Sequence, residues 1–160
     1  MPQKIYIETT IVSYLTADPS ASLIVAGHQK ITLDWWTLRR PAFDLFTSEF
    51  VIDEAAKGDS ELARRRLEAL RAIPSVPISN DIKLLGRRII DEKALPQRAA
   101  IDALHVATAA VHKLDYLMTW NCKHLANALL FQQVRKVCAT SGYECPIICT
   151  PEELMEADNG

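Results

Sequence analysis

Residues 99–121 read A-A-I-D-A-L-H-V-A-T-A-A-V-H-K-L-D-Y-L-M-T-W-N. The first part, 99–114, is rich in alanine and contains neither glycine nor proline, which predicts a helix. The apolar run 115–119 follows at once and has the length of a buried strand. The stretch therefore predicts a helix that leads directly into a strand, which is the repeating unit of parallel α/β sheets.

The rest of the chain continues this alternation. Further short apolar strands are expected at 4–7, 43–48, 75–79 and 145–150. Helices are expected at 10–15, 21–40, 49–58, 60–72, 81–95 and 128–142, with a helix start at 150–153. No strand shows a clean alternation of polar and apolar residues, so both faces of the sheet should be covered. We predict an α/β/α sandwich with a short central parallel sheet, formed by one domain over 1–160.

Local signals place the ends of these helices. Pro41 should stop the long helix, and Gly58 and Gly142 should close two others. Helix caps are expected at Asp59 or Ser60, at Asn80 and at Asn127. Pro77 fits an edge strand better than a central one. The sequence T-P-E-E at 150–153 is a helix start with a threonine cap and a glutamate at the third position.

The composition limits the function. The chain has 160 residues, of which 49% are hydrophobic and 24% charged, as in a soluble globular domain. No apolar run approaches the roughly 20 residues of a membrane span, and the N-terminus does not resemble a secretory signal. We therefore expect a cytoplasmic protein without membrane contact. The net charge of −2 gives no global case for nucleic-acid binding, so such binding would depend on local basic patches such as 64–66 and 87–88.

Polar residues gather where two of the expected strands end. Glu8 follows the strand 4–7, and Thr119 and Asn121 follow or close the strand 115–119. Because parallel strands end at the same edge of a sheet, these side chains should meet there. Glu54 and Asp102, from neighbouring helices, could join them. Carboxylate and amide oxygens are the ligands that Mg²⁺ and Mn²⁺ prefer, so the sequence predicts a metal site at this edge.

Each of these residues also has a plainer interpretation. Glu8 could be a solvated strand end, Asp102 could complement the dipole of its helix, and Asn121 could be a turn residue. Asp53 is as good a candidate as Glu54 on the same helix. No glycine-rich phosphate loop and no nucleophile elbow can be written from the chain.

Two histidines lie near the expected edge. His105 stands three residues after Asp102 on one helix and favours a structural role. His124 follows Asn121 closely and is the more interesting of the two. Trp120 could stack on bases, whereas Trp35 and Trp36 favour core or interface packing.

In their order along the chain, these motifs resemble those of the PIN-domain ribonucleases, including VapC-type toxins. The resemblance rests on I-Y-I-E-T-T at 5–10, V-I-D-E-A at 51–55, D-A-L-H-V-A-T-A at 102–109 and D-Y-L-M-T-W-N at 115–121. It covers essentially the whole chain, including the closing T-P-E-E-L, and implies a PIN-like fold. The segment 102–121 is its most specific part.

The resemblance implies a divalent-metal-dependent endoribonuclease that uses Mg²⁺ or Mn²⁺. It assigns the four acidic positions of the family, in order, to Glu8, Glu54, Asp102 and Asn121. Of these, we expect Glu8, Asp102 and Asn121 to bind the metal. Substrate-binding roles are expected for Thr9, Arg98, Thr119 and His124.

Two positions depart from the family pattern, which has aspartate at both. The glutamate at position 8 is one methylene longer, and the asparagine at position 121 lacks a charge, so we expect weaker metal binding. We expect the RNA-cleaving toxin of a type II toxin–antitoxin pair, with an antitoxin protein as partner and a homodimer as its assembly. The helix 21–40 could supply a face for either contact. The alternatives are a PIN-like domain that binds RNA or protein without cutting, and an unrelated α/β/α protein, either an enzyme that uses Mg²⁺ on phosphoesters or a receiver-like signalling domain.

Overall fold

The computed structural model describes residues 1–156 and contains a five-stranded parallel sheet with the order β3-β2-β1-β4-β5. The strands are β1 (Gln3–Ile7), β2 (Phe43–Ser48), β3 (Ser75–Val76), β4 (Tyr116–Met118) and β5 (Ile147–Cys149). The central strand β1 has no exposure at Ile5, Tyr6 or Ile7, so both of its faces are covered. This explains why the strands read as continuous apolar runs.

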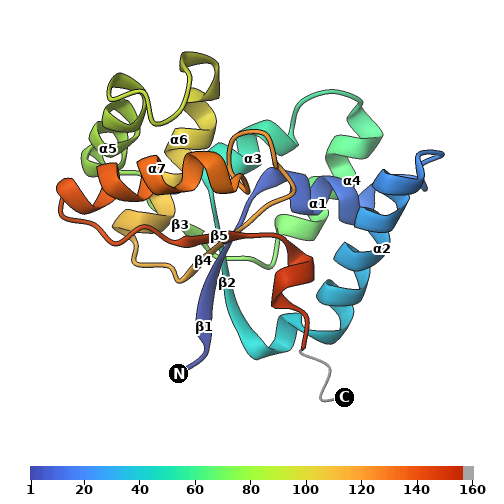
Figure 1. Ribbon diagram of the computed structural model, residues 1–160. Coiled ribbons are helices and arrows are strands. Elements are labelled where there is room, and N and C mark those ends of the chain that lie inside the picture. The colour runs from blue at the N-terminus through green and yellow to red at the C-terminus, as the bar shows by residue number, and fades with distance from the viewer. Residues whose placement is uncertain (157–160) are drawn as a thin grey trace.

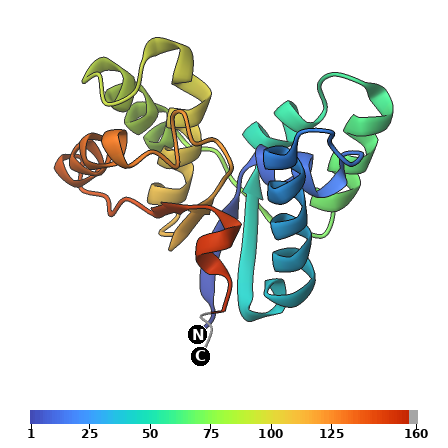
Figure 2. The same ribbon diagram turned by 45° about the vertical axis from the view of Figure 1, so that its right-hand side comes forward.

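Helices cover the sheet on both sides, as Figures 1 and 2 show. One layer contains α1 (Thr9–Thr16), α2 (Leu23–Leu38), α3 (Glu49–Ala55) and α4 (Ser60–Leu70). The other contains α5 (Asn80–Asp91), α6 (Ala100–Val111) and α7 (Ala128–Thr140). Short 3₁₀ turns complete the chain at η1 (Arg40–Ala42), η2 (Gln97–Ala99) and η3 (Pro151–Leu154). The expected α/β/α sandwich is confirmed.

The strand order reverses beside β1. The chain proceeds outward from β1 through β2 to β3, and then returns to place β4 and β5 on the opposite side of β1. The backbone N–H of Glu8 bonds to the carbonyl of Met118 at 3.2 Å, so β1 and β4 end side by side. Ligands of open parallel sheets bind at such a switch point, beyond the carboxyl ends of the strands.

Most helix caps agree with the sequence, and one does not. The side chains of Asp59 and Asn127 accept hydrogen bonds from backbone N–H groups in the first turns of α4 and α7. The prediction of Asn80 as a cap is wrong, because Ser79 accepts the bond from Ile82 N–H and Asn80 is already helical. Two adjacent polar residues offer the same cap signal, and the residue with extended backbone takes the role.

Several elements are shorter than the sequence indicates. The helix expected at 81–95 ends at Asp91, because Lys93 has a left-handed φ of 61° and the chain turns back there. The strand expected at 75–79 pairs only over Ser75–Val76, at the edge of the sheet, since Pro77 has no N–H to donate. The last start signal forms a 3₁₀ turn rather than an α-helix, although its capping box is present.

The long helix α2 covers Leu23–Leu38 and is only partly buried. Ile31 and Trp36 pack against the core. Only Thr32 and Trp35 are buried along it, while Leu23 and Ile24 are largely exposed. Within residues 1–156, no helix has the length and apolar character that crossing a membrane requires.

Candidate functional site

Glu8 connects β1 to α1 at the carboxyl edge of the sheet. Only 3% of the residue is exposed, so the interpretation of Glu8 as a solvated strand end is wrong. Its Oε1 accepts bonds from the Thr10 backbone N–H at 3.1 Å, from the Thr10 hydroxyl, and from the Thr119 hydroxyl at 2.6 Å. Glu8 therefore caps α1 and also ties α1 to the end of β4.

The two threonine hydroxyls in turn accept bonds from the backbone. Trp120 N–H donates to Thr10 Oγ1 at 2.8 Å, and Asn121 N–H donates to Thr119 Oγ1 at 2.9 Å. Each hydroxyl thus passes a hydrogen bond from the loop after β4 to the carboxylate. This arrangement explains why hydroxyl side chains stand beside an acid at a strand end. It fixes the position of Glu8 and uses only one of its oxygens, Oε1, among the described residues.

Glu54, on α3, is held by a second network. Its Oε1 accepts from the Thr9 hydroxyl at 2.7 Å and lies 2.7 Å from His105 Nε2. The other ring nitrogen, Nδ1, lies 2.7 Å from the Tyr6 hydroxyl, which in turn lies 2.7 Å from Ser48 Oγ. His105 has no exposure, and both of its nitrogens have partners. A continuous chain of hydrogen bonds therefore runs from the end of β2 to the Glu54 carboxylate.

Asp102, in the first turn of α6, belongs to a third group. Its Oδ1 accepts from the side-chain N–H of Asn121 at 3.1 Å, and its Oδ2 lies 3.2 Å from His124 Nδ1. The Asn121 oxygen accepts from the His124 backbone N–H at 3.1 Å. Asn121 thus uses both ends of its amide to fix Asp102 and the loop that carries His124.

The environment separates the pKa values of the three carboxyl groups. Burial raises the pKa of Glu8, although the charge of His105 and the threonine hydrogen bonds oppose it. Burial also raises the pKa of Glu54, but the hydrogen bond and charge of His105 outweigh it, and the pKa ends below its usual range. Burial raises the pKa of Asp102 despite the nearby histidines. A cation among these groups would favour the ionised form of each.

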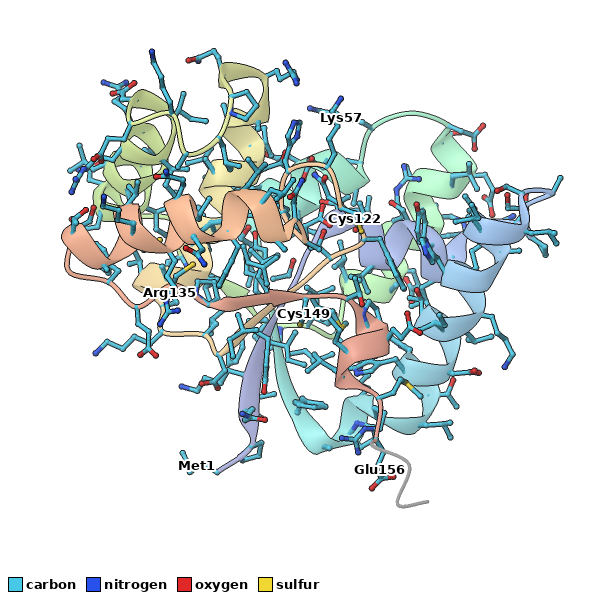
Figure 3. The ribbon with its side chains drawn as sticks, in the orientation of Figure 1. Met1, Lys57, Cys122, Arg135, Cys149 and Glu156 are labelled. Atoms are coloured by element: carbon cyan, nitrogen blue, oxygen red, sulfur yellow. The ribbon has the colours of Figure 1, made fainter. Side chains whose placement is uncertain are left out.

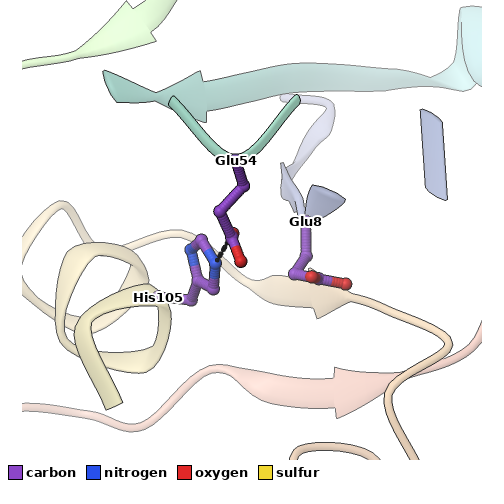
Figure 4. A group of neighbouring side chains, drawn as sticks. All are labelled: Glu8, Glu54 and His105. Carbon is purple, nitrogen blue, oxygen red and sulfur yellow. Dashed lines mark hydrogen bonds and ion pairs between the residues drawn. The ribbon is translucent and has the colours of Figure 1, made fainter. Parts of the chain in front are cut away.

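One set of metal-ligand atoms gathers in the described part of the chain. Oxygens of Glu8 and Glu54 and a nitrogen of His105 all lie within 4.8 Å of one another (Figure 4). Because the nitrogens of His105 are already bonded to Glu54 and Tyr6, this ring supports a ligand rather than acting as one. Carboxylates with a free oxygen on a rigid edge fit a hard cation such as Mg²⁺ or Mn²⁺.

The structure brings most of the expected site residues to one edge. Hydrogen bonds through Thr119 and Asn121 join the network of Glu8 to that of Asp102 and His124. Glu54 belongs to a separate network, and one of its oxygens lies within 4.8 Å of a Glu8 oxygen. Glu54 rather than Asp53 faces the site, since Asp53 is exposed and Glu54 bonds to His105. Their roles in metal binding and catalysis stay predictions.

The residues expected to bind substrate are placed less uniformly. Thr9 and Thr119 give their hydroxyl protons to Glu54 and Glu8. Arg98 is exposed in the turn before α6. Contact of these residues with RNA stays a prediction.

Sequence reasoning missed Tyr6 and Ser48, which complete the network behind Glu54. Their neighbours in the sequence are strand residues, and nothing in the local pattern separates them from ordinary core positions. His105 could be found from its spacing of three residues after Asp102, but its partner on α3 could not.

The fold resembles chains in two solved VapBC structures. One is VapBC2 from Rickettsia felis bound to a DNA fragment from their promoter, with a TM-score of 0.61 and 15% identity over 92% of this chain and 98% of that chain. The other is VapBC-1 from nontypeable Haemophilus influenzae, with a TM-score of 0.59 and 15% identity over 94% and 99% of the two chains. No family model and no curated protein matches the sequence. At this identity the likeness shows the fold, and the protein has a VapC-type PIN fold.

Proposed function

We propose that the protein is a divalent-metal-dependent endoribonuclease and the toxin of a type II toxin–antitoxin pair. One observation carries the proposal: the carboxylates of Glu8, directly after β1, and Glu54, on α3, approach each other at the switch point of a PIN-type sheet. There, ligand atoms of Glu8, Glu54 and His105 lie within 4.8 Å of one another, and Asp102 lies in a linked network. Acid clusters at the carboxyl edge of parallel sheets bind metals and phosphate esters.

In this proposal, Glu8, Glu54 and Asp102 hold Mg²⁺ or Mn²⁺, and Asn121 supports Asp102. A bound divalent cation lowers the pKa of water and offsets negative charge on a phosphodiester. The chain itself supplies rigidity: hydroxyl groups fix Glu8, and the Tyr6–His105 pair fixes Glu54. Carboxylates that cannot rotate away keep their spacing for a metal with strict geometric demands.

The substrate in this proposal is RNA, held through its backbone near the site. Arg98 is exposed at the start of α6, and His124 stands beside Asp102, so both are proposed contacts to phosphate groups. An antitoxin protein and a second copy of the chain are the proposed partners, and the proposed location is the cytoplasm. The exposed apolar residues of α2 support a protein contact on that helix.

The test is RNA cleavage by the purified protein with Mg²⁺ or Mn²⁺, and with EDTA as the metal-free control. Asp102→Asn and Glu54→Gln should each lower the cleavage rate by more than 100-fold. Asp53→Asn removes a carboxylate next to Glu54 that points to solvent, so it should leave the rate unchanged. Equal cleavage by Asp102→Asn and the parent chain would show that the site is wrong.

A second candidate is a PIN-like domain that binds RNA or protein without cutting. It is favoured by Asn121, whose amide oxygen is bonded to the His124 backbone and whose nitrogen is bonded to Asp102. Both ends of the amide are therefore hydrogen-bonded within the chain, and this arrangement does not require a metal at position 121. Titration calorimetry with Mn²⁺ decides: a chain that neither binds metal nor cuts RNA is the binding domain.

A further inference from the structure

A hollow of about 440 Å³ opens between α3, α5 and α6. Its walls include Phe50 from α3, Ile90 from α5 and Leu104 from α6, so its lining is partly apolar. Gly86 lets α5 approach α6 closely, since a Cβ at that position would lie 2.9 Å from a Leu104 methyl carbon. The ribbons of α5 and α6 lie side by side in Figure 1, and this packed pair of helices lines the hollow.

Positive charge lines one side of this hollow. Lys83 and Arg87 stand one turn apart on α5, are both exposed, and contribute to its wall. They also line a smaller hollow of about 310 Å³ beside Leu84. Within residues 1–156, neither cation forms an ion pair, and Asp91 is the one acid in either lining. The balance of charge in the hollow is therefore positive.

The start of α6 adds to this charge. Gln97 and Ala100 line the same hollow, and the cap position before α6 is Ala99, whose side chain offers no acceptor. The first backbone N–H groups of this helix favour a negative group, which Asp102 in its first turn supplies only in part. Arg98 lies in the same turn and is exposed.

The hollow is connected to the candidate site through α3. Phe50 and Glu54 are four residues apart on α3, and thus share a face of that helix. On α6, Leu104 shares a face with Ala100, whereas Asp102 is on another side of the helix. The candidate site is acidic, whereas its neighbour is cationic with an aromatic ring in its wall. A nucleic acid needs both an anion-binding surface and a ring against which a base can lie.

We propose that the groove of Phe50, Lys83, Arg87 and Leu104 binds one nucleotide of single-stranded RNA beside the reacting phosphodiester, with its base on Phe50 and its phosphate on the two cations. The inference rests on the proposed ribonuclease function and extends it to a substrate subsite. An acidic cluster repels the phosphates that flank the cut, so a substrate held near it requires cations close by. The groove supplies them on rigid helices.

The first experiment measures binding of a fluorescent 12-nucleotide RNA by anisotropy, with Asp102→Asn in Mg²⁺ so that the RNA stays intact. Lys83→Glu with Arg87→Glu should weaken binding at least tenfold and reduce the slope of log affinity against log salt by about 1.4, for two lost phosphate contacts. Arg135→Glu with Lys136→Glu makes the same charge change on exposed positions of α7 and should change affinity by less than threefold.

The second experiment tests whether the base of the bound nucleotide lies against Phe50. RNA carrying 5-iodouridine should cross-link to the peptide that contains Phe50, and Phe50→Leu should remove this cross-link and weaken binding about fivefold. Unchanged circular dichroism and thermal unfolding show that each variant is folded.

The outcomes separate the groove from the ribonuclease function. Equal loss of affinity in the groove pair and the α7 pair overturns the groove, and cleavage by the parent chain then still supports the enzyme. Binding that depends on the groove without any cleavage supports the groove and overturns the enzyme. A change in oligomeric mass caused by the groove pair, measured by light scattering, identifies the groove as a protein interface and overturns the proposal. A parent chain that neither binds nor cuts RNA overturns both.

Discussion

Two histidine–carboxylate pairs stand at the carboxyl edge of the sheet, and they are built differently. In the first pair, His105 lies 2.7 Å from Glu54, has no exposure, and has a partner on each ring nitrogen. In the second, His124 lies 3.2 Å from Asp102, 13% of its side chain is exposed, and its Nε2 is buried without a partner among the described residues. The first histidine comes from a helix and the second from a loop.

The difference indicates separate tasks for the two pairs. A buried ring with both nitrogens bonded fixes the carboxylate that it touches, because any movement breaks two hydrogen bonds at once. A loop histidine whose buried second nitrogen has no partner can gain one when a shift of the loop uncovers that nitrogen. We infer that Glu54 is held in place permanently, whereas the surroundings of Asp102 adjust. In Figure 3, the labels of Lys57 and Cys122 lie toward the carboxyl ends of the strands, where both pairs are found, and Met1 lies at the opposite end.

The strongest test of this comparison is to remove each ring in turn. His105→Ala should lower the free energy of unfolding by about 3 kcal/mol, because it opens a cavity and leaves Tyr6 and Glu54 short of partners. His124→Ala should cost about 1 kcal/mol, since a single longer bond is lost. Urea unfolding followed by tryptophan fluorescence measures both.

His112→Ala is the matched control for this pair of variants. His112 caps the end of α6 and makes one exposed bond to the Pro77 carbonyl, so its loss should cost no more than about 0.5 kcal/mol. Equal costs for the variants at positions 105 and 124 would remove the distinction between a fixed and an adjustable pair.

A smaller change tests the chain behind the first pair. Tyr6→Phe removes one oxygen and keeps the ring, so it isolates the hydrogen bonds to His105 Nδ1 and Ser48. The expected loss of stability is about 2 kcal/mol, because two buried polar groups lose their partner. Ser48→Ala should cost about 1 kcal/mol, since the Tyr6 hydroxyl keeps His105 as a partner. A loss below about 0.5 kcal/mol in Tyr6→Phe would show that the chain adds no rigidity.

Glu8 has no hydrogen bond to histidine and is held instead by two threonine hydroxyls and one backbone N–H. Glu8→Gln keeps an oxygen that can accept the bonds from Thr10 and Thr119, and it removes a buried charge. We expect stability at pH 7.5 to rise by about 1 kcal/mol while metal binding falls, as at sites where function opposes stability.

The dependence of stability on pH tests whether the ionised Glu8 carboxylate destabilises the folded state. Burial raises the folded-state pKa of Glu8 above 4.5, so the folded state binds more protons than the unfolded state and loses stability as the pH rises between the two values. The free energy of unfolding of the parent chain should therefore fall as the pH rises through this range. Glu8→Gln should lack this contribution. Parallel stability curves from pH 4.5 to 8 would contradict this.

The sequence predicted the edge of the sheet better than the contacts along it. Alternating apolar runs and helices are enough to predict a parallel sheet, and parallel strands necessarily end together, so Glu8 and Asn121 could be placed at one edge from their positions alone. The tie from Glu54 through His105 to Tyr6 could not be predicted, because it joins α3, α6 and β1 across 51 and 99 positions of sequence. Local patterns carry no information on such partners.

Boundaries failed for a related reason. Ser79 and Asn80 offer the same cap chemistry, and the packing of α5 decides which backbone is extended. Along α2, the apolar residues Leu23 and Ile24 face solvent, although hydrophobicity alone would place them inward. At the start of α5, tertiary packing overrides the local signal. On α2, no part of the described chain covers the two apolar residues.

The smallest expected effect concerns the adjustable pair. Asn121→Asp restores the acid that the PIN pattern has at this position and places a second carboxylate 3.1 Å from Asp102. Without metal, the new carboxylate repels Asp102 and removes the hydrogen bond that Asn121 donates to it, so stability should fall. With Mn²⁺, the added charge should raise metal affinity severalfold, so the variant should gain more in melting temperature than the parent chain does. Calorimetric titration and thermal unfolding, with and without Mn²⁺, measure the two effects. An affinity equal to that of the parent would show that position 121 shapes the loop of His124 and does not contact the metal.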